Sequence, residues 1–195
     1  GVAWAVAGFF PQRVQALVVA NCPPPQVMAR ALKRSPRQLK KSLYMVFFQL
    51  PVIPERMLTA DGSRAIGRSL VGGSYVRSAF DRYEIKIYQD AFSEPGAASA
   101  ALGWYRAAMR HPRSGARLSR TRVSAPTLIL WGERDRFLGV ELVDDAALAD
   151  VMSQGNGADV KKLPDAGHFV QNEAPDLFNE LLLDWLSNQD ASSSS

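Results

Sequence analysis

The sequence of 195 residues is poor in the side chains that build disulfide frameworks and metal centres. Its single cysteine, Cys22, excludes an internal disulfide and is compatible with a reducing, cytoplasmic location. The two histidines, His111 and His168, lie far apart along the chain, so the sequence contains no cluster of histidine and cysteine ligands. We therefore expect neither a metal ion nor an organic cofactor.

Long hydrophobic runs are missing as well. No segment approaches the roughly 20 apolar residues that a transmembrane helix needs, so we expect no membrane span. The net charge is +4, and much of the basic excess lies in residues 30–41 and 106–122. These segments lack the interleaved aromatic side chains of a nucleic-acid site and the glycine-rich loop of a phosphate site. They predict solvated surfaces and no nucleic-acid partner.

The segments that are present alternate between strand and helix, which predicts an α/β protein. Short apolar runs at residues 15–20, 127–131 and 160–163 predict three strands of a parallel sheet. Residues 1–7 predict a helix whose small side chains allow it to pack closely behind a tight strand-to-helix turn. Three strands would leave an apolar edge unpaired, so we expect further strands before Gly1.

A long insertion separates the first two predicted strands. Residues 23–124 are helical in pattern, with amphipathic helices predicted over 37–48, 83–92 and 97–109. A strand-to-strand crossover does not need so much chain, so the insertion predicts an all-helical cap. We divide the chain into a first core part (1–24), a helical cap (25–122), a last core part (123–188) and a serine-rich, disordered tail (189–195).

Two predicted strands lead to an ionisable side chain. Asp135 follows the strand that ends at Trp131 and the glycine after it, and His168 follows the strand that ends at Leu163. Parallel sheets place their chemistry at such strand ends, and a carboxylate followed 33 positions later by a histidine is the order of the second half of an α/β-hydrolase triad. Taken singly, Asp135 could cap the next helix and His168 could be an ordinary loop histidine. The pair in this order favours catalysis.

Tyr44 and Tyr105 lie in aromatic-rich predicted helices of the cap. A cap that folds back over the sheet would bring both side chains to the catalytic surface. Composition alone favours the simpler interpretation, in which both are half-buried packing tyrosines with solvated hydroxyls.

Four segments together resemble the cap and carboxyl-terminal half of the soluble-type epoxide hydrolases of the α/β-hydrolase superfamily. Two of them, around Asp135 and His168, are shared with haloalkane dehalogenases and many esterases. The two tyrosine segments single out the epoxide hydrolases. The segments are Ser42-Leu43-Tyr44-Met45-Val46-Phe47-Phe48-Gln49-Leu50-Pro51, Gly103-Trp104-Tyr105-Arg106-Ala107, Trp131-Gly132-Glu133-Arg134-Asp135 and Gly167-His168-Phe169.

The resemblance implies an α/β-hydrolase fold and a role for each matching residue. It makes Tyr44 and Tyr105 the acids that hold the epoxide oxygen, and His168 with Asp135 the pair that activates water. The substrate it implies is a small lipophilic epoxide, and a cap of this kind can also contribute to a homodimer, whose contacts no residue here specifies. The apolar wall of the site would come from Phe47, Phe48, Trp104 and Phe169.

The family's nucleophile is an aspartate in a His-Asp-Trp-Gly-Gly turn, and Gly1 resembles the final glycine of that turn. We therefore expect the nucleophile and the oxyanion-hole loop to precede residue 1. Without the nucleophile, alternatives stay open: a haloalkane or haloacid dehalogenase that holds a halide with Trp104 and Gln49, a serine esterase, or an inactive fragment acting as a binding module. The residues encoded just before Gly1 distinguish these alternatives.

We expect residues 1–195 on their own to be poorly stable and to show no turnover, because the upstream strands and the nucleophile are missing from the sequence. An assay with styrene oxide tests this expectation. Hydrolysis by this chain above the uncatalysed rate would contradict it.

Overall fold

A parallel sheet of three strands forms the centre of the fold. The structure, a computed structural model, describes residues 1–111, 117 and 120–193. The strands are β1 (Leu17–Ala20), β2 (Thr127–Gly132) and β3 (Ala158–Leu163), in the order β1-β2-β3. Thr127 pairs with Leu17 on one side and with Ala158 on the other. This arrangement confirms the predicted sheet and places β2, which is buried at all six positions, in the middle.

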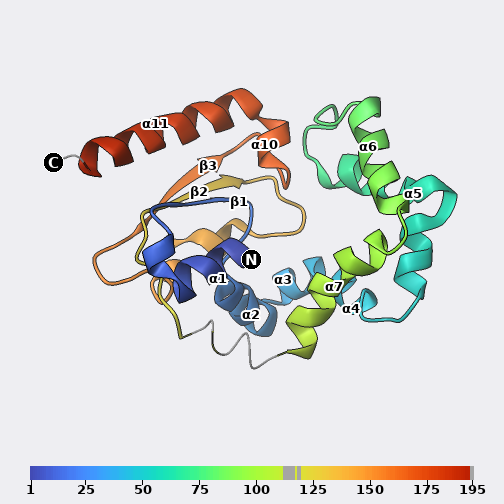
Figure 1. Cartoon of the computed structure of the whole chain (residues 1–195), viewed down its shortest axis with the longest axis horizontal. Coiled ribbons are helices and arrows are strands. Elements are labelled where there is room, and N and C mark those ends of the chain that lie inside the picture. Colours follow the sequence, from blue (N-terminus) through green and yellow to red (C-terminus); the bar gives the residue numbers. More distant parts are fainter. Residues whose placement is uncertain (112–116, 118–119, 194–195) are drawn as a thin grey trace.

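Helices cover both faces of the sheet (Figure 1). Helices α1 (Val2–Phe9) and α2 (Pro25–Arg34) lie on one face, and α11 (Pro175–Ser193) lies on the other. Alternate residues of β2 therefore enter two different cores: Ile129 packs with Trp4 and Val27, whereas Leu128 packs with Trp185. The predicted cap begins at residue 25 and so includes α2. In the structure, however, α2 packs against the sheet and contacts the core. The cap boundaries themselves stay a prediction.

Short elements complete the core around the ends of the strands. Two of them adjoin the site loops: η2 follows the loop of Asp135, and α10 follows that of His168. They are η1 (Pro11–Arg13), η2 (Val140–Val143), α9 (Asp145–Leu148) and α10 (Val170–Glu173).

The predicted cap is helical and has an apolar core of its own. Its buried members come from α5, α7 and the segment between α5 and α6, namely Leu58, Ile66, Leu70, Phe80 and Leu102. In Figure 1 these helices lie to one side of the sheet, beyond the ends of the strands. The helices are α3 (Pro36–Lys41), α4 (Leu43–Phe47), α5 (Ile53–Gly73), α6 (Arg82–Ser93) and α7 (Ala97–Arg110). In the described part of the chain, no helix is both long and apolar enough to cross a membrane.

Two elements differ from the sequence predictions. The helix expected over 37–48 is broken at Ser42, which is 3 % exposed and whose hydroxyl accepts a hydrogen bond from Gln38. The second difference corrects the disordered tail predicted from residue 189, because α11 continues through Ser193. A helix that is already anchored gains a backbone hydrogen bond for each residue it adds, so serine-rich composition is a poor guide there. Residues 194–195 lie outside the described part.

The end of β2 passes very close to the loop that carries His168. A Cβ atom placed on Gly132 would lie 2.2 Å from the carbonyl oxygen of Gly167 and 2.7 Å from that of Ala166. The backbone N–H of Arg134 donates to the Ala166 carbonyl at 2.9 Å, which joins the two loops. The close approach of these two loops therefore requires glycine at position 132.

We expect Gly132→Ala to lower the free energy of unfolding by about 3 kcal/mol, because backbone atoms cannot move aside for the added methyl group as a flexible side chain would. Gly157→Ala is the matched control, since a Cβ there meets no atom within 4 Å. It should change the free energy by no more than about 0.5 kcal/mol. Urea denaturation of both variants measures the difference, and equal effects would contradict the account of this contact.

Candidate active site

The loop after β2 buries the carboxylate of Asp135, whose side chain is fully inaccessible to solvent. Its Oδ1 atom accepts hydrogen bonds from the backbone N–H groups of Phe137 at 2.7 Å and Leu138 at 3.0 Å. These local contacts fix the turn but do not cap a helix, because η2 begins at Val140 and its N-cap, Gly139, receives no side-chain hydrogen bond. They occupy only one of the two carboxylate oxygens.

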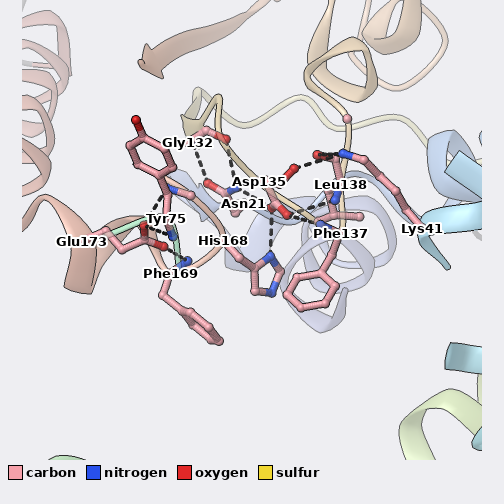
Figure 2. Close-up of polar contacts among 12 residues, drawn as sticks. Asn21, Lys41, Tyr75, Gly132, Asp135, Phe137, Leu138, His168, Phe169 and Glu173 are labelled. Atoms are coloured by element: carbon pink, nitrogen blue, oxygen red, sulfur yellow. Dashed lines mark hydrogen bonds and ion pairs between the residues drawn. The ribbon is translucent and has the colours of Figure 1, made fainter. Parts of the chain in front are cut away.

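The second oxygen of Asp135 faces His168 (Figure 2). His168 Nδ1 lies 2.8 Å from Asp135 Oδ2. A carboxylate can only accept, so Nδ1–H is the donor, and Nε2 is left with its lone pair free to take a proton. The histidine side chain is 30 % exposed, which leaves the ring accessible from one side. The structure thus brings together the two residues that the sequence paired.

The charge of Asp135 is stabilised despite its burial. Burial by itself raises the pKa of the Asp135 carboxyl group and is the largest single effect. The hydrogen bond and charge of His168, the hydrogen bond from Asn21 and the N–H of Phe137 together lower the pKa by more than burial raises it. The net result is a pKa of Asp135 below its ordinary value. The carboxylate is therefore ionised at neutral pH and can stabilise an imidazolium.

Asn21 is a member of the site that the sequence analysis missed. It follows β1 directly, is 4 % exposed and has a positive φ of 39°. Its Nδ2 donates to Asp135 Oδ2 at 2.7 Å, and its Oδ1 accepts from the backbone N–H of Gly132 at 2.7 Å. The amide thus links the ends of β1 and β2 and orients the carboxylate. A polar residue at the end of a predicted buried strand was the signal that could have found it.

Aromatic rings flank the histidine on two sides. The ring centroids of Phe137 and Phe169 each lie 5.0 Å from that of His168. Phe137 also contacts Tyr44, with centroids 5.9 Å apart. Phe137 was not predicted as a site residue, and it connects the imidazole to the cap.

Tyr44 and Tyr105 lie side by side although they are 61 residues apart in sequence. Their ring centroids are 5.8 Å apart, and Phe48 contacts both rings. Burial, then the charge and hydrogen bonding of Tyr105, and then the charge of Asp135 raise the pKa of Tyr44 above its ordinary value. Tyr44 therefore stays a neutral hydroxyl donor over the whole range in which the protein would work. Phe47 extends the group, with its ring 6.1 Å from that of Phe48.

The side chains proposed for a halide site are placed differently. Trp104 is 67 % exposed, so its ring does not contribute to a buried wall next to Tyr105. Neighbouring residues on a helix point about 100° apart, which explains why Tyr105 and Trp104 face different surroundings. The side-chain amide of Gln49 already donates to the backbone carbonyls of Met45 and Tyr105.

Hydrogen bonds hold the two tyrosine segments and the acid loop together. Arg106 donates to the carbonyl oxygens of Phe48 at 2.9 Å and Leu50 at 2.7 Å, which fixes α7 against the end of α4. On the core side, Gln38 Nε2 donates to the carbonyl of Phe137 at 2.8 Å, and Lys41 Nζ donates to that of Asp135 at 3.0 Å. In the part of the chain that the structure describes, no three His, Cys, Asp or Glu side chains gather closely enough to hold a metal ion.

We expect Asp135→Asn to lower the free energy of unfolding by about 2 kcal/mol at pH 7. The NH2 group of the new amide would face N–H donors in either orientation, those of Asn21 and His168 or those of Phe137 and Leu138. Folding lowers the pKa of Asp135, so its contribution to stability is present above the unfolded pKa of about 3.9 and is lost as pH falls through the folded pKa. The gap between wild type and variant should therefore narrow below about pH 4.

Urea denaturation from pH 7 to pH 3 measures that gap. Asp165→Asn is the matched control, because this aspartate is exposed and outside the site. A gap for Asp135→Asn that stays constant over this pH range would contradict the stabilising role of the charge.

The sequence of this chain is similar to those of known hydrolases. No protein-family model matches the chain. Over 189 residues the chain is 32 % identical to the AB hydrolase superfamily protein YfhM of Bacillus subtilis, covering 96 % of this chain and 63 % of that protein. Over 194 residues it is 31 % identical to Epoxide hydrolase 4 of Homo sapiens, covering 96 % of this chain and 51 % of the relative. The chain thus spans between about half and two thirds of the length of these relatives.

Solved structures agree with the fold. A mutant epoxide hydrolase from Bacillus megaterium, complexed with a naphthyloxy-propanediol product, superimposes with a TM-score of 0.78 at 25 % identity, covering 96 % of this chain and 66 % of that one. A structure described as a putative acyltransferase from Salmonella enterica gives a TM-score of 0.82 at 20 % identity, covering 96 % and 60 %, which is a likeness of fold alone. The chain has the C-terminal part of an α/β-hydrolase fold, and it is similar to an AB hydrolase superfamily protein and to epoxide hydrolases over nearly its whole length.

Proposed function

We propose that this chain supplies the cap, the acids and the water-activating pair of an epoxide hydrolase, which converts an epoxide and water to a vicinal diol. One observation carries the proposal. The paired tyrosines of the cap are connected through the ring of Phe137 to the hydrogen-bonded pair of His168 and Asp135. An acid and a base supplied from opposite sides are what the opening of an epoxide and the hydrolysis of the resulting ester require.

In the first step, a carboxylate nucleophile attacks one carbon of the epoxide. We propose that chain preceding Gly1 supplies this aspartate. The new bond joins a carboxylate oxygen to carbon, the carbon–oxygen bond of the epoxide breaks, and the released oxygen takes a proton from a tyrosine hydroxyl. The raised pKa of Tyr44 keeps its proton in place until the oxygen becomes basic enough to accept it. Tyr105, in contact with Tyr44, supplies the second hydroxyl.

In the second step, His168 activates water. Its Nε2 atom takes a proton while the water oxygen attacks the carbonyl carbon of the ester, and the bond from that carbon to the diol oxygen then breaks. The departing diol oxygen takes the proton held by the imidazolium, so the diol leaves neutral and His168 is restored. The nucleophile's carboxyl group then loses its own proton, which restores the tyrosine hydroxyl, and returns to its carboxylate form. The ionised carboxylate of Asp135 stabilises the imidazolium that forms in between.

The substrate we infer is a small lipophilic epoxide. Phe48 and Phe169 lie against the tyrosines and the histidine, and Phe47 lies next to Phe48, so these three rings can form the apolar wall. Trp104 is left out of this proposal because of its exposure. A homodimer, a cytoplasmic location and the lack of a nucleic-acid partner stay predictions.

The site geometry bears differently on the two enzymatic alternatives, a dehalogenase and a serine esterase. A halide leaves without a proton donor, so a dehalogenase gives the tyrosine pair no task, and the amide of Gln49 is engaged by backbone carbonyls. An esterase would use the same pair of His168 and Asp135 with a serine nucleophile. The tyrosine pair favours the epoxide over the ester as substrate.

Variants of a protein that includes the segment before Gly1 test the two roles. His168→Gln should still open the epoxide but fail to hydrolyse the ester, giving a stoichiometric burst of substrate loss and a covalent adduct. Tyr44→Phe combined with Tyr105→Phe should slow alkylation by about a hundredfold to ten-thousandfold and leave no adduct. Intact-protein mass spectrometry after mixing with styrene oxide reports the adduct directly.

Matched variants exist for both changes. His111→Gln alters the other histidine, and Tyr83→Phe combined with Tyr88→Phe removes two hydroxyls of α6; both should behave like the wild type. An adduct in the double variant of Tyr44 and Tyr105, together with none in His168→Gln, would overturn the assigned roles.

A further inference from the structure

Glu173 is a buried acid that none of the steps above uses. It is the last residue of α10, is 8 % exposed, and its carboxylate receives four backbone N–H groups. Oε2 accepts from Gly167 at 2.9 Å, and Oε1 accepts from Phe169 at 3.0 Å. Oε2 also accepts from Tyr75 at 2.8 Å and Val76 at 2.9 Å.

Two of these donors flank the catalytic histidine. Gly167 and Phe169 are the residues immediately before and after His168, so one carboxylate fixes the backbone on both sides of the imidazole (Figure 2). The approach is tight. A Cβ atom on Gly167 would lie 3.0 Å from both the backbone nitrogen of Tyr75 and Oε1 of Glu173.

The other two donors belong to the cap side. Tyr75 and Val76 come just after α5 and its C-cap Ser74, and the end of that helix rests on the rings beside the histidine. A Cβ atom on Gly73 would lie 2.9 Å from the ring of Phe137 and 3.2 Å from that of Phe169. Glu173 thus joins the loop of His168 to the segment of the cap that follows α5, at Tyr75 and Val76.

The chemistry of the group requires a carboxylate. An ionised carboxylate is an acceptor at every lone pair and can receive four N–H donors at once, and bonds to a charged acceptor are the stronger kind. A glutamine at this position would turn one end into an NH2 donor that faces N–H groups. The result would be unpaired donors either beside Phe169 or beside Tyr75, Val76 and Gly167.

We propose that Glu173 is a positioning residue, which sets the imidazole of His168 against Asp135 and couples that geometry to the placement of the cap. This inference rests on the proposed function only in assuming that His168 is the residue that activates water. Its physical content, that one carboxylate determines the geometry of the His168–Asp135 hydrogen bond and the attachment of residues 75 and 76, is independent of the substrate.

Nuclear magnetic resonance of a protein that includes the segment before Gly1 tests the coupling. The downfield resonance of the His168 Nδ1 proton reports the hydrogen bond to Asp135, and amide exchange at Tyr75 and Val76 reports the attachment of the cap segment. In Glu173→Gln we expect the Nδ1 resonance to broaden or disappear and both amides to exchange at least about tenfold faster. Glu180→Gln makes the same chemical change at an exposed glutamate, and should leave all three signals unchanged.

Two further variants separate positioning from a general loss of stability. Leu148→Ala removes a buried side chain of the sheet core and should lower stability while keeping the His168 signal. Gly167→Ala keeps the carboxylate but inserts a methyl group between it and Tyr75, so it should reproduce the effects of Glu173→Gln even if that variant does not fold.

If Glu173→Gln folds and its Nδ1 resonance is unchanged, the proposal is overturned. If Glu173→Gln does not fold, an unchanged Nδ1 resonance in Gly167→Ala overturns it. Equal changes in Leu148→Ala would overturn it as well. Because no readout uses an epoxide, these outcomes are distinct from a failure of the proposed hydrolase activity.

Discussion

The hydrogen bond between His168 and Asp135 depends on how closely two loops approach at the ends of β2 and β3. Gly132 makes this approach achievable, since any Cβ there would collide with the carbonyl oxygen of Gly167. The contact brings the loop of His168 over the turn that buries Asp135, at a separation of 2.8 Å between Nδ1 and Oδ2. A parallel sheet thus delivers acid and base from neighbouring strands, and the rest of the site is arranged around that pair.

Partly buried polar contacts connect this pair to the cap on both sides. Gln38 and Lys41 of α3 bind the backbone of the acid loop, and Glu173 binds the segment that follows α5. Removing one partner of such a contact leaves the other polar group unsatisfied to the extent that water cannot reach it. The tyrosine hydroxyls and the imidazole come from different parts of the fold, and the proposed function has them act on one substrate, so under that proposal their mutual placement matters.

The sequence predicted those parts of the site that have a local signal. An apolar run followed by glycine and an ionisable residue marked Asp135, and the chain order marked His168. Asn21 had only a weak local signal, its place at the end of a predicted strand, because its partner Asp135 lies 114 positions away. Glu173 escaped because its contacts to the segment after α5 lie 98 and 97 positions away. Phe137 looked like any apolar loop residue. Trp104 is adjacent to Tyr105 on α7 and so points about 100° away from it, which is consistent with its exposed side chain.

The central claim is that the two tyrosines of the cap and the histidine of the core act on the same small molecule. A crystal structure with a bound vicinal diol, of a protein that includes the segment before Gly1, tests it most directly. The account predicts one diol oxygen within hydrogen-bond distance of the hydroxyls of both Tyr44 and Tyr105, with the diol carbons between them and His168 Nε2. A diol bound with the two tyrosine hydroxyls directed to separate regions would contradict it.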